Sequence, residues 1–150
     1  MAPLIVMLAG WILFRMLGAA GVLGAASSWS GALRFALAVM FVFTALAHFL
    51  PRTRPDLVRM VPPAFPAPGH LVTVTGIFEF VGAAGLVLPA LTRASAYALM
   101  LLLVALFPAN IHAARKNLPV AGRPATPLNF RLPLQLFWIG ALWWVARSAG

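Results

Sequence analysis

The chain contains no cysteine among its 150 residues. Structural disulfides and metal sites built from thiolates are therefore excluded. Dithiol–disulfide chemistry carried by this chain is excluded as well, because that chemistry requires a thiolate.

Charged residues are also scarce. They make up 9% of the sequence, whereas hydrophobic residues make up 63%, and an ordinary soluble domain has about 25% charged residues. So few charges cannot form a water-facing surface. The composition therefore predicts an all-α integral membrane protein, built almost entirely of transmembrane helices in one compact unit.

The charges that are present are mostly positive, with 11 Lys and Arg against 2 acidic residues. On a soluble protein, the net charge of +9 would suggest nucleic-acid binding. Here the basic residues lie mostly between apolar runs, without a basic patch interleaved with aromatic residues, and membrane topology explains them better. We therefore expect the lipid bilayer as a partner, and no nucleic acid.

Five apolar stretches are candidates to cross a bilayer, whose core of about 30 Å needs about 20 apolar residues in a helix. Helix is expected because lipid offers no partner for backbone N–H and C=O groups. The stretches are Leu4–Gly24, Ala32–Leu50, Leu71–Leu88, Ala94–Ala113 and Leu132–Ala146.

The first stretch has a signal peptide as its alternative interpretation. A signal peptide opens with positive charge and has a short apolar region. This stretch opens without a basic residue and carries Arg15 in its middle, which favours a retained helix. We therefore expect an N-terminal transmembrane helix and short loop at residues 1–30, followed by a four-helix membrane domain at residues 31–150.

The basic residues also favour one orientation. With five spans, the N-terminus and the two long connections, residues 51–70 and 114–131, share one side that carries seven Lys and Arg, Arg123 among them. The opposite side carries Arg34, Arg93 and Arg147. Since cytoplasmic loops carry the excess of Lys and Arg, we expect a multi-pass protein of the inner (plasma) membrane with its N-terminus cytoplasmic and its C-terminus outside.

The first long connection contains six prolines, which end helices and stiffen the chain. Between them, Asp56–Val61 is expected to form one turn of interfacial helix. Its apolar residues Leu57, Val58 and Met60 would dip into lipid.

Glu79 is the one acidic residue within an expected span, eight residues after Leu71. A carboxylate at this depth usually faces the bundle interior, has a partner and marks a functional site. The alternative is an acid that only orders the bundle, either protonated or in an ion pair. Arg15, about 16 Å along the first helix from Leu4, is its candidate partner.

Other polar residues fall at a similar depth, and together they predict a pocket in the cytoplasmic half of the bundle. Four of them also have a structural alternative. His48 would lie among the lipid headgroups, and Asn110 would cap carbonyls freed by Pro108. Arg131 would be a positively charged anchor, and Gln135 would form a hydrogen bond between helices. The proposed pocket residues are Arg15, His48, Glu79, Asn110, Arg131 and Gln135.

No recognised enzyme motif is present: no phosphate loop, dinucleotide turn, zinc-type His-Glu-x-x-His or serine nucleophile elbow. His48 and His112 are weak candidates for haem ligands, because they are two lone histidines. We expect no metal site, and the sequence identifies no specific cofactor. A bound quinone or lipid is the candidate ligand of such a pocket.

Several blocks, in this order and spacing, resemble the DoxX-like family of small membrane proteins over roughly Leu33–Val145. The blocks are Ala47–Pro51 (AHFLP), Met60–Pro63 (MVPP), Phe65–Pro68 (FPAP), Thr75–Glu79 (TGIFE), Leu106–Ile111 (LFPANI) and Arg131–Gln135 (RLPLQ). The resemblance implies a four-helix core, to which the first span would be an addition. It also implies family-type polar positions at His48, Glu79, Asn110, Arg131 and Gln135.

DoxX-like proteins are linked to thiosulfate:quinone oxidoreduction, to redox-stress complexes and to membrane-protein assembly. The leading hypothesis is therefore an accessory subunit whose pocket binds a quinone, a lipid or another small amphiphile, or docks a redox partner. The alternatives are a quinone-linked oxidoreductase component, a proton-coupled transporter and a membrane-protein assembly factor. Catalysis by this chain alone is not expected, and a homo-oligomer is a further candidate assembly.

Overall fold

The computed structural model describes residues 2–119, 122 and 127–149, and this part of the chain is all helical, without strands. The elements are α1 (Ala2–Ala19), the 3-10 turn η1 (Gly24–Ala26), α2 (Trp29–Ala47), α3 (Arg54–Met60), α4 (Pro68–Val87), α5 (Thr92–Arg115) and α6 (Leu128–Ser148). The expected all-helical class is confirmed, and the five long helices lie where the five apolar stretches were expected. Arg123, counted in the charge balance, lies outside the described residues.

Local chemistry explains the helix ends that differ from expectation. The first stretch extended to Gly24, but α1 ends at Ala19 because Gly21 adopts a φ of 74°. That left-handed conformation suits glycine and commonly ends helices. At the start of α2, the side chain of Ser28 accepts a hydrogen bond from the backbone N–H of Gly31 and caps the helix.

Four helices, α1, α2, α4 and α5, are long and apolar enough to cross a membrane. The sixth helix has 21 residues but is not one of these four. Its N-terminal half contains Arg131 and Gln135, and Arg131 lies in the helix rather than at its entrance. By length and composition, the described helices are consistent with a membrane protein.

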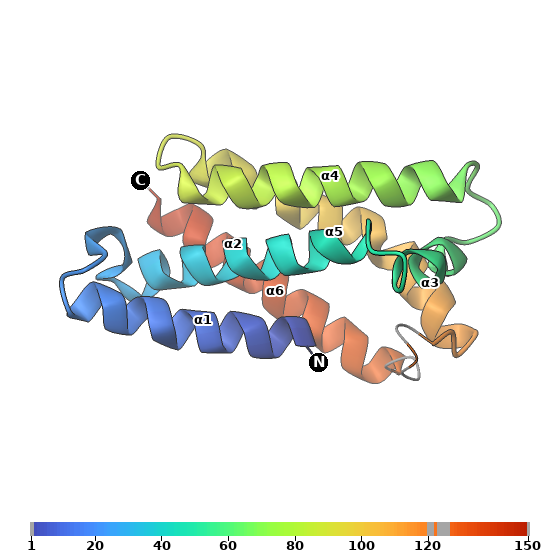
Figure 1. Ribbon diagram of the computed structural model, residues 1–150, viewed down its shortest axis with the longest axis horizontal. Helices are drawn as coiled ribbons and strands as arrows, with labels where there is room; N and C mark the ends of the chain where they lie inside the picture. The colour runs from blue at the N-terminus through green and yellow to red at the C-terminus, as the bar shows by residue number, and fades with distance from the viewer. Residues whose placement is uncertain (1, 120–121, 123–126, 150) are drawn as a thin grey trace.

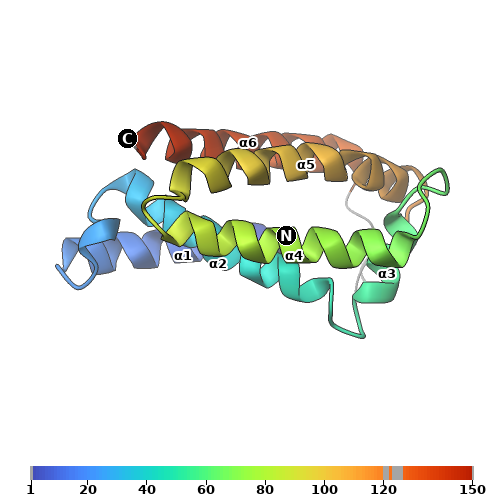
Figure 2. The same cartoon turned by 90° about the horizontal axis from the view of Figure 1, so that it is seen from above.

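Neighbouring long helices run antiparallel, as Figures 1 and 2 show. The second helix packs against α1, α4 and α6, and α5 packs against α4 and α6. Four helices, α2, α4, α5 and α6, therefore surround a common core, and α1 packs along α2. The first long connection, the end of α5 and the start of α6 lie at the end of the bundle that contains α3, called the α3 end below, and the C-terminus lies at the opposite end (Figure 1).

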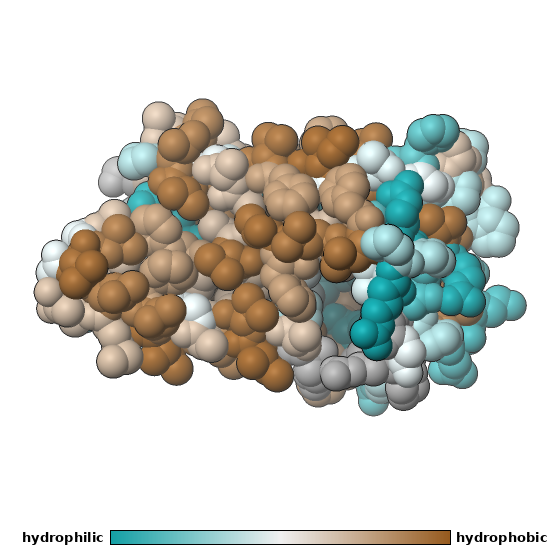
Figure 3. All heavy atoms as spheres, viewed as in Figure 1, coloured by the Kyte–Doolittle hydropathy of each residue, from teal (hydrophilic) through white to brown (hydrophobic). Residues whose placement is uncertain are grey.

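The interior of the bundle is apolar, and so is most of its surface. The largest fully buried side chains of the core include Met7, Leu33, Leu37, Met40, Phe41, Leu86, Leu99 and Leu142. On the face drawn in Figure 3, hydrophobic residues cover the long helices and hydrophilic residues gather at the α3 end. A hollow opens at the boundary between these two regions. Exposed apolar surface of this extent is typical of a protein that meets lipid or a partner.

The short helix α3 crosses one end of the bundle. It begins one residue before Pro55 and contains an ion pair between Asp56 and Arg59. Met60 is buried, and Leu57 and Met60 line a cavity inside the bundle. The expected helical turn is therefore present, but Leu57 and Met60, two of the three side chains expected to dip into lipid, line the cavity instead. They face the interior because α3 packs against α4 and α5.

Candidate functional site

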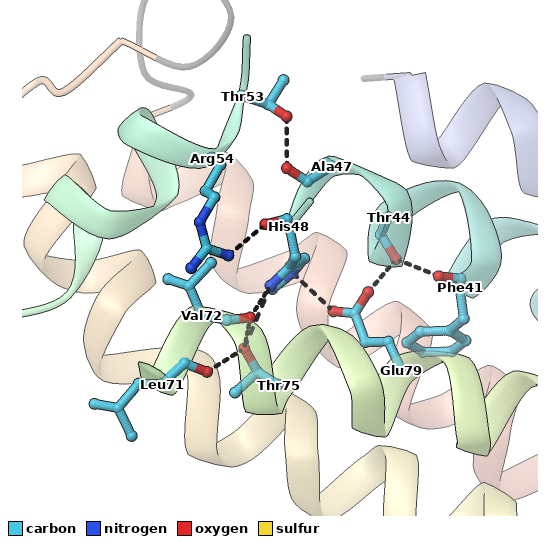
Figure 4. A network of polar contacts seen from close by, with 10 residues as sticks. All are labelled: Phe41, Thr44, Ala47, His48, Thr53, Arg54, Leu71, Val72, Thr75 and Glu79. Atoms are coloured by element: carbon cyan, nitrogen blue, oxygen red, sulfur yellow. Dashed lines mark hydrogen bonds and ion pairs between the residues drawn. The ribbon is translucent and has the colours of Figure 1, made fainter. Parts of the chain in front are cut away.

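Glu79 lies in the middle of α4, buried against the last turns of α2 (Figure 4). Its Oε2 accepts a hydrogen bond of 2.6 Å from the hydroxyl of Thr44. Its Oε1 lies 3.6 Å from Nε2 of His48, which is within ion-pair distance and beyond hydrogen-bond distance. The carboxylate predicted at depth is therefore held by α2, with a hydroxyl on one oxygen and an imidazole near the other.

The backbone of α4 fixes the orientation of the His48 ring. Its Nδ1 lies 2.8 Å from the carbonyl oxygen of Val72. A carbonyl only accepts, so Nδ1 carries a hydrogen and Nε2 points to Glu79. The hydroxyl of Thr75 lies 3.3 Å from the same Nδ1. The contact between Nε2 and Glu79 is then attractive when the pair holds one further proton, either on the ring or on the carboxyl group.

A glycine allows α2 to approach α4 at this point. A Cβ on Gly76 would lie 2.7 Å from Cβ of His48 and 2.9 Å from Cε2 of Phe49. Both distances are shorter than carbon–carbon contacts normally allow. The absence of a side chain at Gly76 therefore allows His48 to lie this close to the backbone of α4.

Arg54 ties the end of α2 to the start of α4. Its guanidinium donates to the carbonyl of His48 at 2.9 Å, to the carbonyl of Gly69 at 3.0 Å and to the hydroxyl of Thr73 at 2.9 Å. A cation is favourable at a helix C-terminus, where the last carbonyls lack partners within the helix. This residue therefore anchors α3 beside the Glu79–His48 pair.

A second polar network joins α5 and α6. Arg131 donates to Oδ1 of Asn110 at 3.0 Å, the amide of Asn110 donates to Oε1 of Gln135 at 3.3 Å, and the amide of Gln135 donates to the carbonyl of Leu103 at 2.5 Å. That carbonyl lies within α5, so the last of these bonds ties a side chain of α6 to the backbone of α5. These residues thus form one chain of hydrogen bonds along the α5–α6 seam.

A cavity of about 400 Å³ lies between the two networks at the α3 end. Five helices and the segment after α3 contribute to its wall. Its described polar lining is Thr44, His48, Thr75, Glu79 and Asn110, and its apolar lining includes Met40, Phe41, Leu57, Met60, Phe65, Leu103, Leu106, Ala109 and Trp138.

The structure divides the six predicted pocket residues into three groups. Three of them, His48, Glu79 and Asn110, line the cavity. Arg131 and Gln135 are not among its described lining residues, and they act on Asn110 from behind the wall. In the described structure, both residues contact Asn110, which lines the cavity.

Arg15 does not join this site, which corrects both its predicted place in the pocket and its pairing with Glu79. Its guanidinium lies 5.2 Å from the ring centroid of Trp29, at the start of α2. A Cβ on Gly10 would meet Ala36 at 3.5 Å, so α1 and α2 pair with residue 10 opposite residue 36. This register places Arg15 opposite residue 31, about 25 Å along α2 from His48 at 1.5 Å per residue.

Four contributing residues were not predicted: Thr44, Arg54, Thr75 and Trp138. The sequence did contain a signal for the two threonines. Thr44 and His48 are four residues apart, as are Thr75 and Glu79, and this spacing places each pair on one helix face. Nothing in the sequence separates Trp138 from the other tryptophans, and its indole N–H is buried without an acceptor among the described residues.

His48 and His112, the two histidines considered as haem ligands, each bond to a backbone carbonyl. No group of three or more His, Asp or Glu that could hold a metal ion occurs in the described part of the chain. Nδ1 of His112 lies 3.0 Å from the carbonyl of Met60 and fastens the end of α3 to α5. His48 and His112 therefore hold backbone carbonyls, and the other nitrogen of His48 faces Glu79.

Comparison with known proteins places this site within a family. A family model described as "Domain of unknown function (DUF8561)" matches residues 37–146, a range that includes both polar networks and the cavity. No curated protein and no solved structure matches the chain. Because the match covers most of the sequence, the chain belongs to the DUF8561 family.

Proposed function

We propose that this protein is a small integral membrane protein whose cavity binds a small amphiphile, such as a quinone or a lipid. One observation carries the proposal: a cavity of about 400 Å³ with mainly apolar walls includes a buried carboxylate–imidazole pair. Sites for small molecules typically measure about 300–1,000 Å³ and combine apolar walls with a few placed polar groups.

The proposed topology has five helices that cross the bilayer, with the α3 end in the cytoplasm of a cell with an inner (plasma) membrane. Apolar surfaces on the long helices and the hydrophilic α3 end support it (Figure 3). Six of the described basic residues belong to the α3 end, namely Arg52, Arg54, Arg59, Arg115, Lys116 and Arg131, and Arg15, Arg34, Arg93 and Arg147 belong to the other end. The excess of positive charge favours the cytoplasm for the α3 end.

Each side chain of the cavity has a chemical task in this proposal. Glu79 accepts a hydrogen bond or a proton from the ligand, and His48 shares that proton. Asn110, held by Arg131 and Gln135, orients the polar group of the ligand from the opposite helices. Phe65 and Trp138 contact its apolar part.

We also propose kinship with DoxX-like proteins and a role as an accessory subunit of a membrane complex. The blocks quoted for that resemblance all lie inside the residues matched by the family model.

The test is ligand retention. The protein is purified from its native membranes in mild detergent, and extracted small molecules are compared by mass spectrometry. Ala109→Phe fills the cavity, whereas Ala84→Phe places the same ring on the exposed face of α4 and serves as the control. Glu79→Gln keeps the shape of the cavity and removes the carboxylate.

We expect a quinone or lipid that co-purifies with the wild type and with Ala84→Phe and falls at least tenfold in Ala109→Phe, with a smaller loss in Glu79→Gln. Identical extracts from the wild type and Ala109→Phe would refute the proposal. In that case the function would lie in a protein partner, which pull-down from native membranes would identify.

A further inference from the structure

The charges around the cavity restrict what can occupy it. We propose that the ligand is an uncharged amphiphile with a hydroxyl or carbonyl head, and neither an anion nor a cation. This inference rests on the proposed function, because it assumes that the cavity holds a ligand.

The described cavity wall contains one acidic residue and one histidine, and neither lysine nor arginine. Since Nδ1 of His48 donates to Val72, the contact of 3.6 Å between Nε2 and Glu79 is favourable when the pair carries one shared proton. In either arrangement of that proton, the net charge of the pair is zero. A ligand of either sign would therefore leave its own charge uncompensated in apolar surroundings, which is costly.

Two nearby cations are held away from the ligand. Arg54 donates to three acceptors on α2 and α4, and Arg131 donates to Asn110. Neither is among the described residues that line the cavity. The phosphate of a lipid or the carboxylate of a fatty acid would therefore meet no guanidinium from either residue inside the cavity.

A neutral head has matching partners. Nε2 of His48 and Oε1 of Glu79 lie too far apart for a direct hydrogen bond, at 3.6 Å. A hydroxyl can accept from the first and donate to the second, and a carbonyl can accept from whichever of the two carries the shared proton. The remaining wall, which includes Leu106, Phe65 and Trp138, suits an apolar tail.

The experiment compares three probes with the same undecyl tail: undecanol, undecyl sulfate and undecyltrimethylammonium. The two charged probes are titrated below their micelle-forming concentrations, and undecanol below its solubility limit, into the protein in phosphatidylcholine nanodiscs, and the melting temperature is followed. A ligand that binds the folded state raises it in a saturable manner. Ala109→Phe removes cavity binding, and Ala84→Phe controls for effects on the bilayer.

We expect undecanol to bind the wild type and Ala84→Phe at least tenfold more tightly than either charged probe, with its effect lost in Ala109→Phe. If a charged probe binds as tightly as undecanol and is lost in Ala109→Phe, the inference of a neutral ligand is wrong while cavity binding stands. If no probe separates the wild type from Ala109→Phe, both the inference and the proposed function are overturned.

Discussion

Replacing Gly76 with alanine should push α2 away from α4 at the Glu79–His48 pair. The added Cβ would lie 2.7 Å from Cβ and 3.0 Å from Cγ of His48, and 2.9 Å from Cε2 of Phe49. Carbon atoms are in optimal contact at about 3.5–4.0 Å, so the end of α2 would have to move by roughly 1 Å. This movement would lengthen the 2.8 Å hydrogen bond between His48 and Val72.

The expected loss in the free energy of unfolding follows from two opposing effects. Overpacking a tight interior typically costs about 1–3 kcal/mol. Alanine is a better helix former than glycine by about 1 kcal/mol, which offsets part of that cost. We therefore expect Gly76→Ala to lower the free energy of unfolding by up to about 2 kcal/mol and to reduce ligand retention, because the polar wall of the cavity is displaced.

The matched control is Gly140→Ala on α6, where an added Cβ meets no atom within 4 Å. It should leave stability unchanged or slightly raised, and ligand retention unchanged. Both variants are compared with the wild type by thermal unfolding in nanodiscs and by mass spectrometry of extracted ligands. If Gly76→Ala matches Gly140→Ala in both measurements, the close approach of α2 and α4 does not position the pair, and this reasoning is refuted.

Two other changes test the second network and the topology. Gln135→Leu removes the hydrogen bonds that join Gln135 to the carbonyl of Leu103 and to the amide of Asn110, and should lower the free energy of unfolding by about 1–2 kcal/mol, measured by denaturant titration. An unchanged midpoint would show that this network does not hold α5 to α6. Because the chain has no cysteine, Ala64→Cys and Ala90→Cys, at opposite ends of the bundle, report sidedness directly. In intact cells, a membrane-impermeant maleimide should label Ala90→Cys and not Ala64→Cys, and the reverse pattern would contradict the proposed orientation.

The helices and the depth of the polar residues could be predicted from the sequence, because both depend on the order of residues along one helix. Apolar runs of membrane length in a chain with 9% charged residues predict helix. Counting residues along each run identified His48, Glu79 and Asn110 as candidates, and all three line the cavity. The same reasoning located a short helix between the prolines of the first long connection.

Only the tertiary structure decided which polar faces meet. The sequence grouped Arg15 with Glu79 by depth, but the register of α1 on α2 places Arg15 beside Trp29. That register depends on small-residue contacts, such as Gly10 against Ala36, and residue counts along one helix do not define it. The rotation of each helix likewise decided that Asn110 lines the cavity while Arg131 and Gln135 support it. Depth is a property of one helix, whereas contact is a property of how helices pack.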